Sequence, residues 1–488
     1  MDAKNNVLFD LIKSLTKTEK RFIKLNAQFH QGDKAYLKLF DAIEKQKKYD
    51  EKEILEQFKT EKFIIQFSVA KNYLQNFILK QLRNYHTESK ANIICKNLLI
   101  DIEILYWKNQ FKLAEKLVKK AEKIAQEYQF FLTLEELSNW ENRIDNAQLR
   151  LNVKHSKTIS NKHENNIKNY QAILEYKALI NETQLLIKES EVIRDKNELD
   201  TYKKLLNHPL IKEKSNSNSY EATYSYYVLN SVLHRLIKDQ KKSGEYRAKL
   251  VDYLEQFPHI NKENSIHYLS SVHNLLMHSL VVKDYKSFAN YLDKVKNFKI
   301  SSAREQSAVL DMLCLFELGY YNETKQYDKA IEFVNEIFET HSNIKSILNS
   351  EHYYLVHYHT ALAYFNIGDY KNALVWINKV INLTSKNLRV DIKAATYVLN
   401  IITHYELSNF ILLPYLVKTT LDFLKNSKML RPIDKFFISI FSTISATSNQ
   451  QQKALFFNKK LSSIKKLKLE ESIISDIDYM DWLARKAT

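Results

Sequence analysis

Five aromatic residues recur at nearly constant spacing in the second half of this 488-residue chain. They are Tyr246, Tyr285, Tyr327, Tyr370 and Phe410, separated by 39, 42, 43 and 40 residues. At each of them an apolar stretch ends and a second amphipathic stretch begins within three residues, which predicts two helices joined by a short turn. Two short helices cannot bury their apolar face alone, so the copies must stack on one another. The spacing therefore predicts an α-solenoid.

The scarcity of glycine supports an all-α fold. The chain has four glycines and four prolines, while 45% of its residues are hydrophobic. Glycine supplies the positive φ angles of hairpin turns and the close backbone approach of phosphate-binding loops, so sheets and nucleotide-binding folds are both disfavoured. We therefore expect an all-α fold, with a right-handed solenoid of helical hairpins and an N-terminal helical domain.

The cysteines and the N-terminus indicate where the protein resides. Cys95 and Cys314 each lie in an apolar helical stretch, where a buried thiol is expected to act as a small hydrophobic residue. The opening residues do not resemble a secretory signal, and no apolar run approaches the roughly 20 residues of a membrane span. We expect a cytoplasmic protein that does not engage a membrane.

The formal charge of +16 suggests nucleic-acid binding until its source is examined. Lysine supplies 62 of the 73 basic residues and arginine only 11. Arginine is the better bidentate partner of phosphates and bases, so this composition favours a general bias toward lysine. A nucleic-acid partner is possible but not favoured.

Residues 1–90 predict a compact N-terminal helical domain. Thr16 with Glu19, and Asp50 with Glu53, form capping-box pairs at two predicted helix starts. The stretch from Phe63 to Tyr85 is apolar on most of its circumference and is expected to be central to this domain.

Residues 91–214 predict a segment of long helices. It begins with one helical pair, in which Phe111 takes the turn-aromatic position and Ala114, Val118 and Ala121 take close-packing positions. The polar residues 152–163 predict a loop. Residues 215–219 (SNSNS) predict a surface connection and a domain boundary, followed by a repeat array over residues 220–488.

The clearest repeat, residues 359–380 (HTALAYFNIGDYKNALVWINKV), resembles the tetratricopeptide repeat. The matching positions are Ala361, Tyr364, Gly368, Asp369, Tyr370, Ala373, Ile377 and Val380. The preceding copy keeps Tyr321, Tyr327, Asp328, Ala330, Val334 and Ile337 but has Lys325 at the turn glycine. The family period is 34 residues, so these units are long and divergent. The opening LIKSLTKTEKRFIKL also resembles the start of uncharacterised Bacteroidota solenoid proteins, which implies no activity.

The resemblance implies a concave groove lined by the first helix of each repeat. The groove-facing residues implied for three successive copies are His273, Met277 and Leu280; Met312, Leu315, Asn322 and Glu323; and Leu355, Tyr358, Leu362, Phe365 and Asn366. Such a groove suits an extended peptide or a helix of another protein, with Tyr358 and Phe365 as aromatic anchors. The alternative is that the apolar members pack against neighbouring repeats and bind nothing.

The sequence offers little that could support catalysis. His352, His357 and His359 lie close together but lack the i, i+4 spacing and third ligand of helical zinc sites, so we expect His357 to be a structural histidine. No nucleophile motif or isolated carboxylate pair is present, and no cofactor or metal is expected. We predict a non-enzymatic protein–protein interaction scaffold, for which a homo-oligomer is possible. The alternative is a DNA-binding transcriptional regulator whose recognition helix starts near Ser68.

Overall fold

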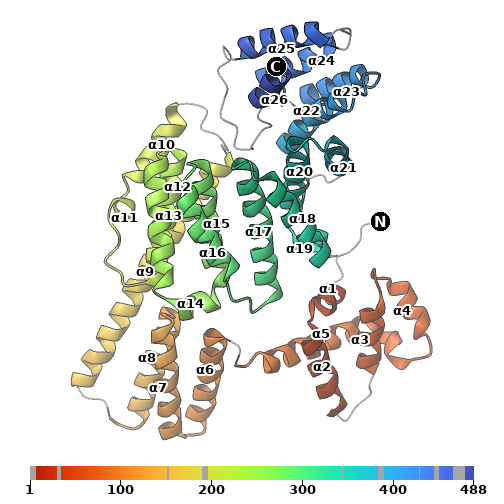
Figure 1. The fold of residues 1–488 in the computed structure, drawn as a ribbon. Helices are drawn as coiled ribbons and strands as arrows, with labels where there is room; N and C mark the ends of the chain where they lie inside the picture. Colours follow the sequence, from red (N-terminus) through yellow and green to blue (C-terminus); the bar gives the residue numbers. More distant parts are fainter. Residues whose placement is uncertain are drawn as a thin grey trace. The chain divides into compact units, whose positions relative to one another are not determined.

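A computed structural model describes most of the chain. It covers residues 7–29, 35–88, 90–150, 153–189, 196–341, 344–382, 390–427, 429–444, 450–464 and 479–487. Every element of secondary structure in these ranges is a helix, which confirms the all-α prediction (Figure 1). The chain divides into two compact units, Met1–Leu186 with Glu213–Ser225 and Ile187–Lys212 with Tyr226–Thr488.

The first unit begins with short helices around their own core. These are α1 (Val7–Ser14), α2 (Lys17–Phe29), α3 (Ala35–Lys45), α4 (Glu51–Gln57), the 3₁₀ helix η1 (Lys62–Gln66) and α5 (Phe67–Tyr85). The capping box at Thr16 is confirmed, because the Thr16 and Glu19 side chains each accept a backbone N–H of the other residue. At Asp50 only half of the box forms, because the Asp50 N–H donates to Gln46 instead of Glu53.

Four longer helices follow in this unit. They are α6 (Ala91–Trp107), α7 (Phe111–Glu127), α8 (Phe131–Ala147) and α9 (Val153–Glu189), of which α6 packs on α7 and α7 on α8. Ala114, Val118 and Ala121 are buried between them, as predicted. The loop predicted at 152–163 is wrong, because residues 153–163 belong to α9. Polar residues without glycine or proline do not stop a helix, and Lys162 ties this one to both Glu122 and Glu141.

The second unit contains most of the helices, which pack in sequential pairs consistent with helical repeats. Its first helices are α10 (Lys196–Leu206), α11 (Pro209–Lys212), α12 (Tyr220–Leu236, which starts in the first unit), α13 (Gln240–Glu255), α14 (Pro258–Glu263), α15 (Ser265–Val281) and α16 (Tyr285–Lys296). They are followed by α17 (Ala303–Glu323), α18 (Tyr327–Thr340), α19 (Ile344–Ile347), α20 (Ser350–Asn366) and α21 (Tyr370–Ile381). The last are α22 (Val390–Glu406), α23 (Leu413–Asn426), α24 (Pro432–Ile444), α25 (Gln450–Ile464) and α26 (Tyr479–Ala487).

One turn geometry recurs between the paired helices of the second unit. A residue with positive φ ends the first helix at Lys238, Lys283, Lys325, Gly368 and Ser408. The N–H of the next residue then donates to the carbonyl oxygen five residues earlier, at 2.8 to 3.0 Å, which is the long bond of a Schellman motif. The same backbone conformation therefore recurs in all five of these turns, although only one of them has glycine at the position with positive φ.

This geometry corrects one position of the aromatic ladder. Tyr285, Tyr327 and Tyr370 each start a helix after the turn, as predicted, and Phe410 lies in its turn. Tyr246 lies inside α13, whereas the turn of that repeat is at Lys238 and Asp239. The prediction failed there because Gln240 occupies the position where the other copies have an aromatic residue.

The connection at 215–219 is present, but it is not the surface loop that its composition suggested. Ser217 and Ser219 are buried. The Ser217 hydroxyl donates to the side-chain oxygen of Asn169 at 2.8 Å, and the Ser215 N–H donates to the Tyr176 hydroxyl at 3.1 Å. Small polar side chains here satisfy buried polar groups of α9. The three predicted domains, with boundaries near 90 and 214, stay a prediction.

Candidate functional site

Most residues predicted to line a groove are buried. The side chains of Leu355, Tyr358, Leu362 and Phe365 on α20 belong to the largest apolar core, with Tyr358 1% and Phe365 0% exposed. On α17, Met312, Leu315 and Asn322 are buried as well, whereas Glu323 is exposed. His273, Met277 and Leu280 on α15 and Asn366 on α20 are partly exposed.

The burial of Tyr358 and Phe365 follows from the sequence of α20. Apolar or small residues lie all around this helix, and a helix that is apolar on every side is buried. It packs against α17, α18, α21 and α22. This arrangement corrects the expectation that Tyr358 and Phe365 face an open groove. A direct role of these two residues in binding stays a prediction, and their side chains offer no exposed surface that would support it.

The predicted asparagines are engaged within the protein. The amide group of Asn322 donates to the carbonyl oxygens of Leu318 at 2.9 Å and His359 at 3.3 Å, which joins α17 to α20. The amide of Asn366 donates to the Leu362 carbonyl oxygen at 3.0 Å. These donors stabilise the packed helices.

His273 lies in a cluster of basic groups contributed by α13, α15 and α20. Its ring stacks on His352 at 6.3 Å, and burial, followed by the nearby His352, lowers the pKa of His273 to about 4. Arg247 is 8% exposed and donates to the carbonyl oxygen of Asn274, while its Nε has no hydrogen-bond partner. Burial lowers the pKa of Arg247 to about 10. His352 in turn contacts Asp311 at 2.5 Å.

The C-terminal helix α26 is held by an aromatic cluster. Trp482 is 1% exposed, and its ring contacts Tyr405, Phe437, Phe441 and Phe457 at centroid distances of 5.7 to 6.3 Å. The nearby Lys486 pairs with Glu406 at 2.7 Å. Sequence analysis did not single out Trp482, although an isolated WL pair in a polar tail was a usable signal.

An exposed apolar surface lies at the turn before α23 and the first turn of that helix. It consists of Phe410, Ile411, Leu412 and Tyr415, which are 38%, 95%, 48% and 69% exposed. We call it the 410–415 turn. Phe410 rests on Tyr405 at 5.8 Å, so this surface is anchored directly on the core.

The other repeats have polar residues at the corresponding positions. After the aromatic residue of the turn they carry Lys286 and Ser287, Asp328 and Lys329, and Lys371 and Asn372, where this repeat carries Ile411 and Leu412. The positive-φ residue and the long Schellman bond are the same in these turns, although α23 begins only at Leu413 whereas the other helices begin at the aromatic residue. The Schellman turn thus forms with either polar or apolar side chains after the aromatic residue. Comparison among the repeats would have identified this surface from the sequence.

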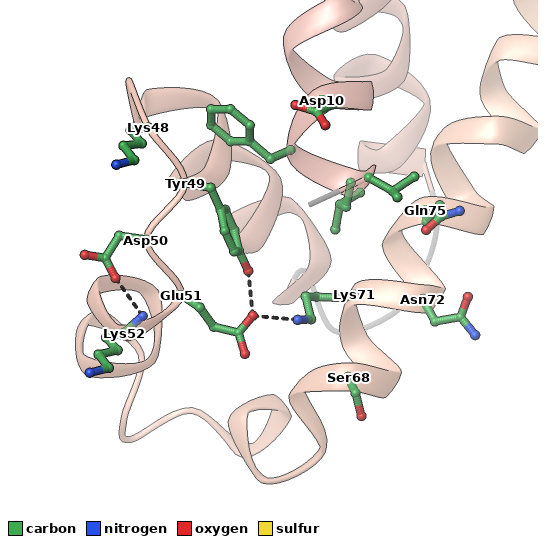
Figure 2. Close-up of a pocket in the computed structure, with 13 residues that line it drawn as sticks. Asp10, Lys48, Tyr49, Asp50, Glu51, Lys52, Ser68, Lys71, Asn72 and Gln75 are labelled. Carbon is green, nitrogen blue, oxygen red and sulfur yellow. Dashed lines mark hydrogen bonds and ion pairs between the residues drawn. The ribbon is translucent and has the colours of Figure 1, made fainter. Parts of the chain in front are cut away.

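A pocket of about 740 Å³ lies in the first unit among α1, α4, α5 and the segment before α4 (Figure 2). Figure 2 shows Glu51 accepting from the Tyr49 hydroxyl at 2.9 Å and pairing with Lys71 at 2.7 Å. Three acidic and three lysine side chains line it: Asp10, Asp50, Glu51, Lys48, Lys52 and Lys71. The formal charges of these lining residues balance, and no histidine or cysteine is among the lining residues that the structure describes.

The cysteines and histidines of the described residues were the remaining candidates for a reactive or metal-binding site. Burial raises the pKa of the Cys314 thiol to about 12, which keeps it protonated and unreactive, and both cysteines are buried as predicted. Among the described residues, no group of three or more His, Cys, Asp or Glu side chains is placed to hold a metal ion. His357 is 2% exposed and packs among aromatic rings, as expected of a structural histidine.

The helix proposed for DNA recognition, α5, begins at Phe67 after a 3₁₀ turn. Its exposed residues include the apolar Val69, Tyr73 and Leu79 as well as the basic Lys80 and Arg83, and DNA recognition by this helix stays a prediction. In the part of the chain that is described, no helix has the length and apolar character needed to cross a membrane. No protein-family model matches the chain, and comparisons with curated proteins and with solved structures found no match.

Proposed function

We propose that this chain is a non-enzymatic, cytoplasmic interaction protein, built as a tetratricopeptide-like solenoid, that binds another protein through the 410–415 turn. The observation that supports the proposal is the exposure of four large apolar side chains at one turn of the repeat array. Clustered exposed apolar groups of this kind are typical of protein-binding surfaces.

The composition of the 410–415 turn suits a protein partner. Burying an isoleucine, leucine or aromatic side chain stabilises a complex by about 1.5–3 kcal/mol each. Tyr415 adds a hydroxyl group for a hydrogen bond, and aromatic side chains are enriched among binding hot spots. Pro414 lies in the first turn of α23, a position that favours the start of a helix, and Tyr415 is therefore presented from ordered backbone. The partner that fits is a protein with an apolar groove that accepts a protruding turn.

A pair of matched double variants tests this proposal. The full-length protein, tagged and expressed in its native cells, is compared with Ile411→Ser/Tyr415→Ser and with the control Val282→Ser/Val375→Ser. Val282 and Val375 are also exposed apolar residues, at 44% and 51%, but lie outside the 410–415 turn. All three proteins should have unfolding free energies within about 1 kcal/mol of one another, because these side chains are exposed.

Quantitative mass spectrometry of co-purified proteins provides the measurement. We expect at least one protein to be recovered with the wild type and the control but at least about tenfold less with the Ile411→Ser/Tyr415→Ser variant, in line with the loss of two hot-spot contacts. The purified pair should then bind directly in calorimetry. If no protein depends on Ile411 and Tyr415 for recovery, the 410–415 turn is not the binding surface and the proposal fails.

A further inference from the structure

Helix α6 in the first unit has an exposed face that is largely apolar. Its core-facing residues Cys95, Leu98 and Ile102 pack toward α7 and α8. On the opposite face Ile100, Ile104 and Trp107 are 57%, 48% and 72% exposed. Their spacing of four and three residues aligns them in one stripe along the helix.

Trp107 differs from the other tryptophans of the protein. Trp140, Trp376 and Trp482 are 7%, 9% and 1% exposed, so each of them is part of a core. Tryptophan is the residue most enriched at binding hot spots, and an exposed one in an apolar stripe marks a contact surface.

Two charged residues, one further apolar residue and the partly exposed Asn97 complete this face of α6, with Asn97 on the side of Ile104 away from the charges. Lys96 and Glu103 are exposed, and Ile93 is partly exposed. At 100° per residue, Lys96 and Glu103 lie on the same edge of the stripe formed by Ile100, Ile104 and Trp107. The face therefore has an apolar centre with one positive and one negative charge along a single edge.

This face is complementary to itself in an antiparallel arrangement. In a two-fold pair of α6 helices that cross beside Ile100, residues equally far from Ile100 in sequence lie opposite one another. Trp107, seven residues after Ile100, then faces Ile93 of the second copy, seven residues before it. Lys96 of one copy and Glu103 of the other copy then lie at nearly the same height along the helices and on the same edge of the interface, where their opposite charges attract.

We propose that α6 is a homodimer interface, and that the occupant of its exposed face is α6 of a second copy of this chain, packed antiparallel with Ile100 near the two-fold axis. Ile100, Ile104 and Trp107 supply the apolar contact. Lys96 and Glu103 favour the antiparallel direction, because a two-fold axis along the helices would place the charged edges of the two copies on opposite sides of the interface, where Lys96 and Glu103 cannot pair. This inference is independent of the 410–415 turn.

Charge reversal and restoration give the decisive test on the full-length protein. Sedimentation equilibrium is measured for the wild type, Lys96→Glu, Glu103→Lys and the double variant Lys96→Glu/Glu103→Lys. We expect the wild type to dimerise with a dissociation constant in the micromolar range and each single reversal to weaken dimerisation about tenfold. The double variant should return to within about threefold of the wild type, because the pair is restored with exchanged positions.

A second series tests the apolar contact. Ile104→Ser/Trp107→Ala should weaken dimerisation at least about thirtyfold. Leu132→Ser on α8, a residue that is 57% exposed and lies outside the α6 face, should leave it unchanged. Acrylamide quenching of tryptophan fluorescence should fall as the wild-type concentration rises, since Trp107 is the tryptophan that solvent reaches in the single chain.

Three outcomes would overturn the inference. The first is a wild-type protein that stays monomeric up to about 200 µM, a concentration at which contacts of micromolar affinity are populated. The second is a dimer that is unaffected by Ile104→Ser/Trp107→Ala. The third is a Lys96→Glu/Glu103→Lys variant that dimerises as weakly as the two single variants. That result would mean that α6 binds a different partner or pairs in a different geometry.

Discussion

The indole Nε1 of Trp482 donates a hydrogen bond to Oε1 of Glu406 at 2.7 Å and thereby links α26 to the end of α22. The other carboxylate oxygen of Glu406 pairs with Lys486 from the same C-terminal helix. The Glu406 side chain is only 6% exposed, so these hydrogen bonds lie in a buried contact. The last described helix is therefore attached both by apolar packing and by a buried polar pair.

Two substitutions at Trp482 should separate these contributions. Trp482→Ala removes a buried ring and should lower the free energy of unfolding by about 3–5 kcal/mol. Trp482→Phe keeps an aromatic ring and loses the bond to Glu406, so it should cost about 1–3 kcal/mol. Urea denaturation measures both. Equal costs for the two substitutions would show that the ring contacts with Tyr405 and its neighbours contribute little.

Replacing Tyr358 and Phe365 by alanine should destabilise the second unit. Both side chains lie in the core, and removal of a buried aromatic ring costs about 3–5 kcal/mol each. The double variant should lose most of its cooperative thermal transition, measured by circular dichroism. A melting temperature close to that of the wild type would mean that these side chains are accessible after all, and would restore the groove as a binding surface.

Ala373 tests the packing between the two helices of the clearest repeat. Its side chain is 0% exposed in α21, which packs on α20. Ala373→Glu would force added volume and a charge into this contact and should cost about 3 kcal/mol or more. The matched change Lys371→Glu lies on the exposed side of the same helix and should stay within about 0.5 kcal/mol. Similar thermal shifts for the two would contradict this packing.

His357 should make the protein less stable in acid. Burial, with a smaller contribution from the nearby Lys379, lowers the pKa of His357 from 6.5 to about 4, against the opposing effect of the hydrogen bond that its Nδ1–H donates to the Tyr353 carbonyl oxygen at 2.7 Å. Between pH 6.5 and 4 the unfolded chain binds a proton that the folded protein does not. Stability is therefore complete above about pH 6.5 and falls toward pH 4, by about 3 kcal/mol for such a pKa difference.

The variant His357→Phe keeps an aromatic ring of similar size and cannot be protonated. Its free energy of unfolding, measured by urea denaturation from pH 7.5 to 4, should decline less steeply than that of the wild type. A residual decline is expected because burial also lowers the pKa of His273 to about 4. Identical pH profiles for variant and wild type would show that His357 is solvated in the folded state.

Helix pairing was predictable because turn and packing positions have local signatures. Asp369 caps α21 and accepts the Asn372 N–H, and Ala330, Ala373 and Ala114 occupy close contacts that leave no room for larger side chains. The helical continuity of residues 153–163 was not predictable from composition, because their polar side chains are stabilised by partners remote in sequence. His163, for example, contacts Glu135 at 2.5 Å.

The candidate sites were harder to predict than the helices. The resemblance to tetratricopeptide repeats assigns a direction to each helix face, but whether that face is open depends on how closely successive units pack. That distance is set by many side chains together, but the apolar character of α20 on every side was a usable sign that Tyr358 is buried. Ile411 could have been found, because the other repeats have a polar residue at the same position. Trp107 could have been found as well, because it lies on the face of its helix that is opposite the core.

The enclosure of α20 by α17, α18, α21 and α22 also determines how the second unit comes apart. In a strictly linear array each unit can open next to its neighbour, and the ends fray independently. A helix held from several sides cannot open until its surroundings have separated, so its amide hydrogens should exchange only through the largest opening of this unit. We therefore expect α20 to mark the slowest-exchanging segment, with protection decreasing toward α10 on one side and α26 on the other.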